Sequence, residues 1–207
     1  MIKIDLDKLQ RGLGVKLNTS QKANITDMLD AFNSYDYKAR SISDKSWLGY
    51  VAYMFATAWH ETGSTMSPLE EWGKGRNKTY GTWYINSKGV AYSFKDDTKT
   101  QAYLKSDYPF LYYGRGYVQL TWYANYERAS RELGVNLLKD PTIALNKAVA
   151  TKIMILGMIE GWFTTHKLSR YITDKTQDFK TARKIINGMD KASTIEGYAK
   201  AFFSSLS

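Results

Sequence analysis

The chain has 207 residues, of which 43% are hydrophobic and 14% aromatic, so it is long enough to bury a core and too apolar for a disordered segment. It has no cysteine and two histidines, which excludes disulfides and thiol nucleophiles and leaves little for a zinc hydrolase site. Its net charge of +9 favours anionic partners, but no Lys/Arg block or nucleic-acid motif accompanies that charge, so we expect no nucleic acid.

The first third of the chain predicts helices. A short apolar-periodic segment ends around Gly12 and Gly14, and the pair Thr19-Ser20 can cap a helix over roughly 21–34. The inner face of that helix is expected to hold Ile25, Met28, Leu29 and Phe32. A further helix begins near 43–45 and runs to about Glu61.

One stripe of the helix that ends at Glu61 joins four apolar residues to a carboxylate: Trp47, Val51, Met54, Ala58 and Glu61. A carboxyl group in apolar surroundings holds its proton more tightly because desolvation disfavours the charged form, and folds build general acids in this way. A second acidic pair, Glu70-Glu71, follows Pro68. One shielded and one more exposed carboxyl group predict acid/base chemistry. The alternative is that Glu61 is a helix-terminal residue satisfied by local hydrogen bonds.

Competing hydrolytic chemistries have weaker support in the sequence. The chain contains neither an H-E-x-x-H nor a G-x-S-x-G motif, so metal-dependent and serine hydrolases are both disfavoured. His166 follows a predicted helix and is expected to be structural or exposed to solvent. Paired-carboxylate chemistry is what remains.

Residues 76–108 show little helical periodicity and are rich in small and polar residues. We predict an irregular excursion that forms a binding element, with a short hairpin whose first strand is 82–85 and whose turn is 86–89. The alternative is a surface loop without a binding role.

The segment 112–122 combines glycines with an alternating pattern. The glycines on either side of Arg115 allow a tight turn or a close backbone approach. The alternation beyond them predicts a short strand with Tyr117, Gln119 and Thr121 on a substrate-contacting face, and Val118, Leu120 and Trp122 toward the core. An ordinary half-buried edge strand fits the same pattern.

The last third predicts four more helices. They are expected over 122–134, from 140–141 to about 163, over 178–187 and over about 193–206, with the second of these as the central buried helix. We expect one mainly α-helical domain over 1–207, with a small β element and no separate wall-binding domain. The chain shows no signal-peptide pattern and no transmembrane run, which predicts a protein made in the cytoplasm.

Three segments resemble motifs of glycoside hydrolase family 19, and they occur in the family's order. They are Ala58-Trp59-His60-Glu61-Thr62, the segment 112–122 (YYGRGYVQLTW) and Ile185-Ile186-Asn187-Gly188. The family contains plant-type chitinases and chitinase-like endolysins of bacteriophages, and the resemblance, over about residues 45–200, is closest to the short phage and bacterial members. It implies a lysozyme-like helical fold of two lobes, with a small β element beside the cleft.

The resemblance also implies an inverting mechanism with two carboxylates and no metal or organic cofactor. Glu61 would be the general acid, Glu71 the general base, and Thr121 would help to place the water. Inversion needs room for that water, so the carboxyl groups are expected roughly 6.5–9.5 Å apart. Glu71 is preferred over Glu70 because it precedes an aromatic-glycine pair, Trp72-Gly73.

Further positions would contact the sugar or support the cleft. The substrate-binding set is Gln119, Asn125, Asn187, Tyr113, Arg115, Trp72 and His60. Within it, Arg115 is expected to pair with one of the carboxylates. Lys191 is the candidate for a basic residue that the family carries after its I-N-G segment.

Three functions remain open at this stage. The first is a phage-type endolysin, which cuts the β-1,4 bond between N-acetylmuramic acid and N-acetylglucosamine and waits in the host cytoplasm until a holin opens the membrane. Its partners would be peptidoglycan strands and the anionic cell envelope, and we expect a monomer. The second is a chitinase. The third, a non-catalytic sugar-binding protein on the same fold, is disfavoured because both carboxylates are present.

Overall fold

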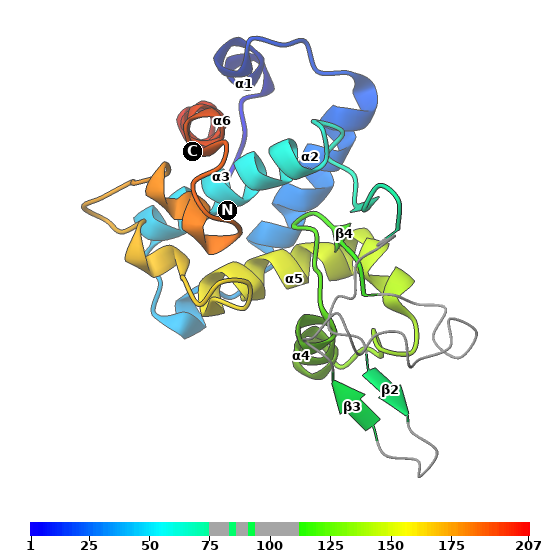
Figure 1. The fold of residues 1–207 in the computed structure, drawn as a ribbon. Coiled ribbons are helices and arrows are strands. Elements are labelled where there is room, and N and C mark those ends of the chain that lie inside the picture. Colours follow the sequence, from blue (N-terminus) through cyan, green and yellow to red (C-terminus); the bar gives the residue numbers. More distant parts are fainter. Residues whose placement is uncertain (75–82, 86–90, 94–111) are drawn as a thin grey trace. The chain divides into compact units, whose positions relative to one another are not determined.

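The computed structural model describes residues 1–74, 83–85, 91–93 and 112–207, and over these ranges the chain is mainly helical with small β elements, as predicted (Figure 1). The chain divides into two compact units. The first contains Met1–Ser67 and Thr151–Ser207, and the second is Pro68–Ala150. Across the described ranges, every helix is too short or too polar to cross a lipid bilayer.

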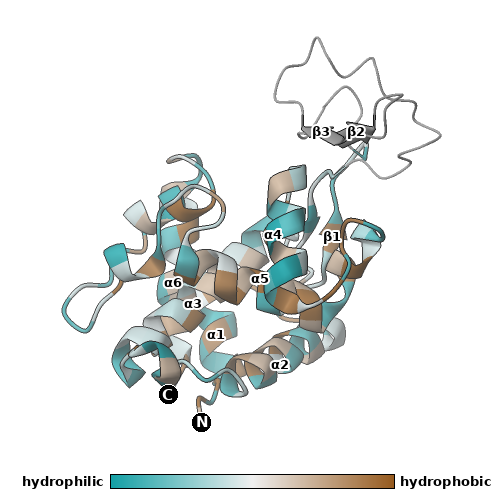
Figure 2. Cartoon of the chain, turned by 90° about the horizontal axis from the view of Figure 1, so that it is seen from below, coloured by the Kyte–Doolittle hydropathy of each residue, from teal (hydrophilic) through white to brown (hydrophobic). Residues whose placement is uncertain are grey.

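The first unit begins with three helices, each of which has a side-chain cap at its start. Helix α1 (Leu6–Leu13) is capped by Asp5 and stops at Gly14, which adopts a left-handed conformation. Helix α2 (Thr19–Asn33) starts two residues before the predicted position, because Asn18 and not the pair Thr19-Ser20 caps it, in a reciprocal capping box with Gln21. All four residues predicted for its inner face are buried, and both hydrophobic and hydrophilic residues are visible along it in Figure 2.

Helix α3 (Asp44–Glu61) is the core of the first unit. Ser43 caps it, and most of its residues are buried, including all four apolar members of the predicted stripe. It packs against α6 (Ala192–Ser205), where the rings of Phe55 and Phe202 stack with centroids 5.0 Å apart. Gly49 allows a close approach on another side, because a Cβ there would lie 2.6 Å from Ile172. The α3 and α6 predictions are thus confirmed to within a residue or two.

The long helix predicted from 140 to 163 is wrong at its start. The structure has a 3-10 helix η3 (Pro141–Leu145), then Asn146 in an extended conformation, then α5 (Lys147–Glu160). The Asn146 side chain accepts hydrogen bonds from the backbone N–H groups of Ala148 and Val149, so it caps a new helix instead of continuing the old one. α5 begins in the second unit and continues in the first.

The basic helix predicted over 178–187 is also wrong. Only a 3-10 segment, η5 (Thr181–Ile185), forms there. The first unit has two shorter 3-10 segments earlier in the chain, η1 (Lys38–Arg40) and η4 (Leu168–Arg170). Asp178 is hydrogen-bonded to the N–H of Thr181 and starts η5. Ala182, Arg183 and Ile185 are buried, so η5 presents its side chains to the core of the first unit.

The second unit contains the β elements. Strands β1 (Leu69–Glu70) and β4 (Arg115–Gly116) pair antiparallel, with Glu70 opposite Arg115. Strands β2 (Trp83–Ile85) and β3 (Ala91–Ser93) pair as the predicted hairpin. Thr82, the predicted turn residues 86–89 and the rest of the predicted excursion lie outside the described ranges. Helix α4 (Tyr123–Leu133) ends at Gly134 as predicted and is largely hydrophilic (Figure 2).

The strand predicted over 117–122 is not formed. Backbone hydrogen bonds join Arg115 and Leu120 in both directions, so the residues between them make a tight turn. Positive φ angles at Gln119 (51°) and Trp122 (74°) break the alternation, because a strand needs negative φ throughout. Tyr117, predicted to face the substrate, is buried, whereas Trp122, predicted for the core, is exposed.

Candidate active site

Glu61 lies in the last turn of α3, at the boundary between buried core and solvent. Its side chain is 18% exposed, while the preceding residues of the helix are almost entirely buried. Thr62 ends the helix, since its hydroxyl donates to the carbonyl of Ala58 and accepts from the N–H of Met66. These bonds fix the chain direction just beyond Glu61. His60, the neighbouring predicted residue, is half-buried in the same turn.

A guanidinium contacts the Glu61 carboxylate. Arg183 Nη1 donates to Glu61 Oε1 at 2.8 Å, and Arg183 Nε donates to the carbonyl of Asp190 at 3.0 Å. Arg183 is 3% exposed, so this is a largely buried cation held in a fixed orientation. The purely apolar surroundings predicted for Glu61 are therefore wrong, because the Arg183 guanidinium binds its carboxylate.

Sequence reasoning missed Arg183 because its partner lies 122 residues away in the chain. The only available signal was its position four residues before Asn187 in the third motif. Lys191, the basic residue considered instead, is exposed and has no ion pair with Glu61; it precedes α6 with a left-handed backbone.

Asn187 follows η5 in the first unit and is exposed. Its side-chain oxygen accepts from the N–H of Gly188 at 2.9 Å, and its own N–H donates to the carbonyl of Arg183. The motif Ile185-Ile186-Asn187-Gly188 is thus tied through the backbone to the residue that holds Glu61.

In the second unit, Glu70 is the centre of a charged network. Its Oε1 accepts from the Tyr113 hydroxyl at 2.7 Å and lies 3.5 Å from Arg115 Nε, and Lys74 Nζ lies 3.4 Å from Oε2. The Tyr113 hydrogen bond, followed by the charges of Lys74 and Arg115, lowers the pKa of Glu70 below its usual range. Arg115 was expected to pair with one of the two proposed catalytic carboxylates, and the carboxylate it pairs with here is their neighbour Glu70.

Arg115 is 2% exposed and is held on several sides. Its guanidinium stacks over the ring of Tyr113, with Cζ 3.6 Å from the ring centroid, and Nη1 donates to the Tyr126 hydroxyl at 3.1 Å. The Tyr126 hydroxyl in turn donates to the carbonyl of Tyr113 at 2.8 Å. Burial raises the pKa of Tyr126, which keeps that hydroxyl a donor. Arg115 thus organises the unit around Glu70.

Glu71 has a different setting from Glu70. Its N–H donates to the carbonyl of Gly114 at 2.7 Å, and its Oε2 accepts from the N–H of Gly114 at 3.0 Å. These contacts with one glycine fix both the backbone and the carboxylate of Glu71. The side chain is half-buried, and the following residue, Trp72, is 99% exposed.

The remaining predicted residues of the second unit line the turn after Arg115. Gln119 Nε2 donates to the carbonyls of Leu69 (3.2 Å) and Gly116 (3.4 Å), so this amide holds β1 against the turn. Asn125 Nδ2 donates to the carbonyl of Thr121 at 2.9 Å. Thr121 and Asn125 are both half-buried. The structure brings Gln119, Thr121, Asn125, Tyr113 and Arg115 into the unit that contains Glu71, and it places Glu61, His60 and Asn187 in the other.

Solved chitinases share this fold. The chain aligns with a bacterial family 19 chitinase at a TM-score of 0.58 and 21% identity, covering 96% of this chain and 93% of the other. It aligns with a class IV chitinase from Zea mays at a TM-score of 0.57 and 18% identity, covering 95% and 89%. The architecture is therefore that of the family 19 chitinases.

Sequence comparison defines the family. The family's sequence model, described as chitinase class I, matches residues 22–171. Basic endochitinase B of Arabidopsis thaliana is 33% identical over an alignment of 145 residues that covers 63% of this chain and 39% of that protein. A second Arabidopsis protein, endochitinase At2g43590, is 27% identical over 163 residues, 78% of this chain and 50% of its own length. The chain belongs to glycoside hydrolase family 19, and its matches span half or less of these curated relatives.

Proposed function

We propose that this protein is a glycoside hydrolase that cleaves β-1,4 bonds between N-acetylated hexosamines by an inverting mechanism. The observation that carries the proposal is the setting of Glu61, a half-buried carboxyl group at the end of a buried helix, fixed by a buried arginine. General acids need a fixed direction for proton delivery, and this arrangement supplies one.

Glu61 is the proposed general acid. Arg183 binds Oε1, so we assign the transferred proton to Oε2. That proton passes to the glycosidic oxygen as the bond from this oxygen to the anomeric carbon breaks. Arg183 acts as a positioning residue, because it binds the carboxyl group of Glu61.

Glu71 is the proposed general base. It accepts a proton from the water that attacks the anomeric carbon from the opposite face, which balances the proton given by Glu61. Glu71 is supported by its hydrogen bond from the Gly114 N–H, which orients its carboxylate. Glu70 acts as the counter-charge of Arg115 and Lys74. Thr121 and Asn125 are proposed to place the water and the sugar, and exposed Trp72 to stack on a sugar ring.

Peptidoglycan is the proposed polymer, in the manner of an endolysin. The net charge of +9 supports attraction to an anionic envelope, where the enzyme would reach the wall after membrane permeabilisation. The second candidate is chitin, which is favoured by the names of the relatives, all endochitinases. The two polymers share the N-acetylglucosamine unit and differ at the lactyl ether and peptide of muramic acid.

A paired assay tests the substrate. Loss of turbidity of outer-membrane-permeabilised Gram-negative cells is measured beside product release from N-acetylglucosamine oligomers, with Glu61→Gln as the inactive control. Faster lysis than oligomer cleavage supports peptidoglycan, and the reverse order assigns a chitinase. Activity of neither kind in the wild-type chain would contradict the proposal. Anhydromuramic ends in digested peptidoglycan would also contradict it, because hydrolysis leaves reducing ends.

A further inference from the structure

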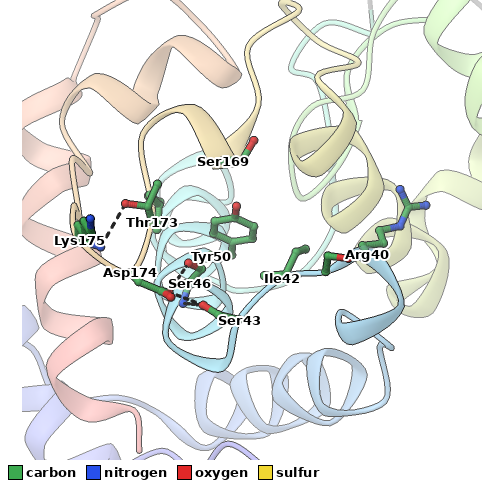
Figure 3. Close-up of a pocket in the computed structure, with 11 residues that line it drawn as sticks. Arg40, Ile42, Ser43, Ser46, Tyr50, Ser169, Thr173, Asp174 and Lys175 are labelled. Carbon is green, nitrogen blue, oxygen red and sulfur yellow. Dashed lines mark hydrogen bonds between the residues drawn. The ribbon is translucent and has the colours of Figure 1, made fainter.

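A pocket of about 440 Å³ lies in the first unit (Figure 3). Its lining includes the first turns of α3, the helix that ends at Glu61. The rest of the lining comes from the segment 40–43 and the segment 169–175. Ser46 in its wall precedes Glu61 by 15 residues, which is about 22 Å along a helix. The volume is within the range of about 300–1,000 Å³ typical of small-molecule sites. No role assigned above uses this pocket.

Six of the eleven residues that line the pocket carry a hydroxyl group. They are Ser41, Ser43, Ser46, Tyr50, Ser169 and Thr173. Tyr50 is 4% exposed, and its hydroxyl points toward Ser169 in Figure 3. Burial raises the pKa of Tyr50, so this group remains a neutral hydroxyl. Hydroxyl groups both donate and accept hydrogen bonds, which suits a ligand that does the same.

Asp174 supplies the one carboxylate of the lining. Its Oδ1 accepts hydrogen bonds from the hydroxyls of Ser43 and Ser46, the latter at 2.7 Å, and these bonds lower its pKa. Asp174 is therefore ionised at neutral pH. A carboxylate can accept about four hydrogen bonds, so it keeps capacity for donors on a ligand.

The charges of the lining cancel. Arg40 is paired with Glu160 at 2.7 Å, and the remaining lining charges, Asp174 and Lys175, have opposite signs. A site for an anion or a cation would carry an excess of the other sign. Ile42 and Ile172 add apolar surface. A neutral ligand with several hydroxyl groups and an apolar face is the best match.

We propose that this pocket is a second glycan-binding site, which takes a neutral N-acetylated hexosamine unit at a distance from Glu61. The choice of this sugar rests on the function proposed above, while the polyhydroxylated, neutral class follows from the lining. Such a site would hold a second stretch of polymer on the enzyme.

The test is an NMR titration of the full-length Glu61→Gln chain, which should bind without cleaving, with the N-acetylglucosamine tetramer. We expect backbone amide shifts at Thr173 and Asp174 in addition to those at Thr62 and Gly63 beside Glu61. Ser169→Tyr, at an exposed position, fills the pocket. It should raise the Kd reported by Thr173 and Asp174 at least tenfold and leave the Kd reported by Thr62 and Gly63 unchanged. Ser20→Tyr, at an exposed serine outside the pocket, should change neither.

A second variant tests the chemistry of the lining. Tyr50→Phe removes one hydroxyl and keeps the ring, so binding at the pocket should weaken roughly two- to tenfold, as for one hydrogen bond.

The outcomes separate the two proposals. Shifts at Thr62 and Gly63 alone would overturn the second site and leave the proposed function standing. Shifts at Thr173 and Asp174 alone would support the second site and contradict the assignment of Glu61. Shifts at Thr173 and Asp174 that an alanyl-glutamyl-lysine peptide causes and the tetramer does not would overturn the sugar assignment. If the tetramer shifts neither these amides nor those of Thr62 and Gly63, both proposals are contradicted.

Discussion

Glu70 and Glu71 are adjacent in the sequence, but their contacts differ. Glu70 accepts from Tyr113 and faces Arg115, and Glu71 is bound to both polar groups of the Gly114 backbone. The sequence could predict an acidic pair near Glu61, and the aromatic-glycine pair after it favoured Glu71. It could not reveal the partners, because Tyr113, Gly114 and Arg115 come more than 40 residues later.

Replacement of each carboxylate should separate the two roles. Glu71→Gln should lower kcat by about 10²–10⁴, as expected for loss of a general base, with little change in Tm. Glu70→Gln should retain most activity but lose about 1–3 kcal/mol of stability, because buried Arg115 loses a charged partner. Kinetics on oligomers and thermal unfolding measure both effects. The opposite pattern would make Glu70 the base.

The contribution of Glu70 to stability should depend on pH. Its pKa is lowered in the folded state, chiefly by the Tyr113 hydrogen bond. A lowered folded pKa gives stabilisation that is present above the unfolded value, about 4.3 for Glu, and is lost as pH falls through the folded value. The difference in Tm between the wild type and the less stable Glu70→Gln variant should therefore be largest near pH 7 and decrease below about pH 4. A difference independent of pH would contradict the ion-pair account.

Arg183 should matter through Glu61. Arg183→Met keeps much of the side-chain volume and removes the bond to Oε1, so we expect kcat to fall about 10²-fold with a small change in KM. Arg183→Lys should restore part of kcat, since a cation returns without the fixed guanidinium geometry. Equal losses in both variants, matched by equal losses of Tm, would indicate a purely structural role.

At the scale of elements, the sequence predicted what local signals determine. Helix α3 follows from Ser43 as a cap and a long apolar run, and α4 from the glycine at its end. The turn at 117–120 was missed because alternation of apolar residues does not encode the positive φ of Gln119. The break before α5 was missed because Asn146 interrupts an otherwise continuous apolar pattern with its own cap.

Gly114 should be sensitive to a methyl group. A Cβ there would lie 2.5 Å from Gln119 Oε1 and 3.3 Å from its Cβ, so Gln119 must move and lose its bonds to β1 and the turn. We expect Gly114→Ala to cost about 1 kcal/mol, or roughly 2–4 °C in Tm, and to lower activity through Glu71. The matched control is Gly197→Ala, in open space on α6, which should keep activity and gain up to about 1 kcal/mol.

Asn146 tests the corrected boundary of α5. Asn146→Ala removes the acceptor for the N–H groups of Ala148 and Val149 and should cost about 1 kcal/mol in thermal unfolding. Asn146→Asp keeps an acceptor and should retain most of the stability. If both variants unfold at the wild-type temperature, the cap contributes nothing and the break has another cause.

At the scale of the whole molecule, the motifs identified the family and the structure confirmed the mainly helical architecture. The chain divides into two compact units, with Glu61 in one and Glu71 in the other. The single catalytic domain, the separation of the two carboxyl groups and the location in the cell stay predictions. Sequence motifs locate the candidate residues, and the paired assay assigns the polymer.

The stereochemistry of the first product tests the central claim most directly. A general acid and a general base acting on opposite faces invert the anomeric carbon, so each cut of a β-1,4 bond should release an α-anomer. Proton NMR of a fresh digest, recorded before mutarotation, on whichever polymer the paired assay shows to be cleaved, measures this. We predict α-anomeric signals first, with the β form growing in later. β-Anomers as the first product would contradict the assignment of Glu61 and Glu71.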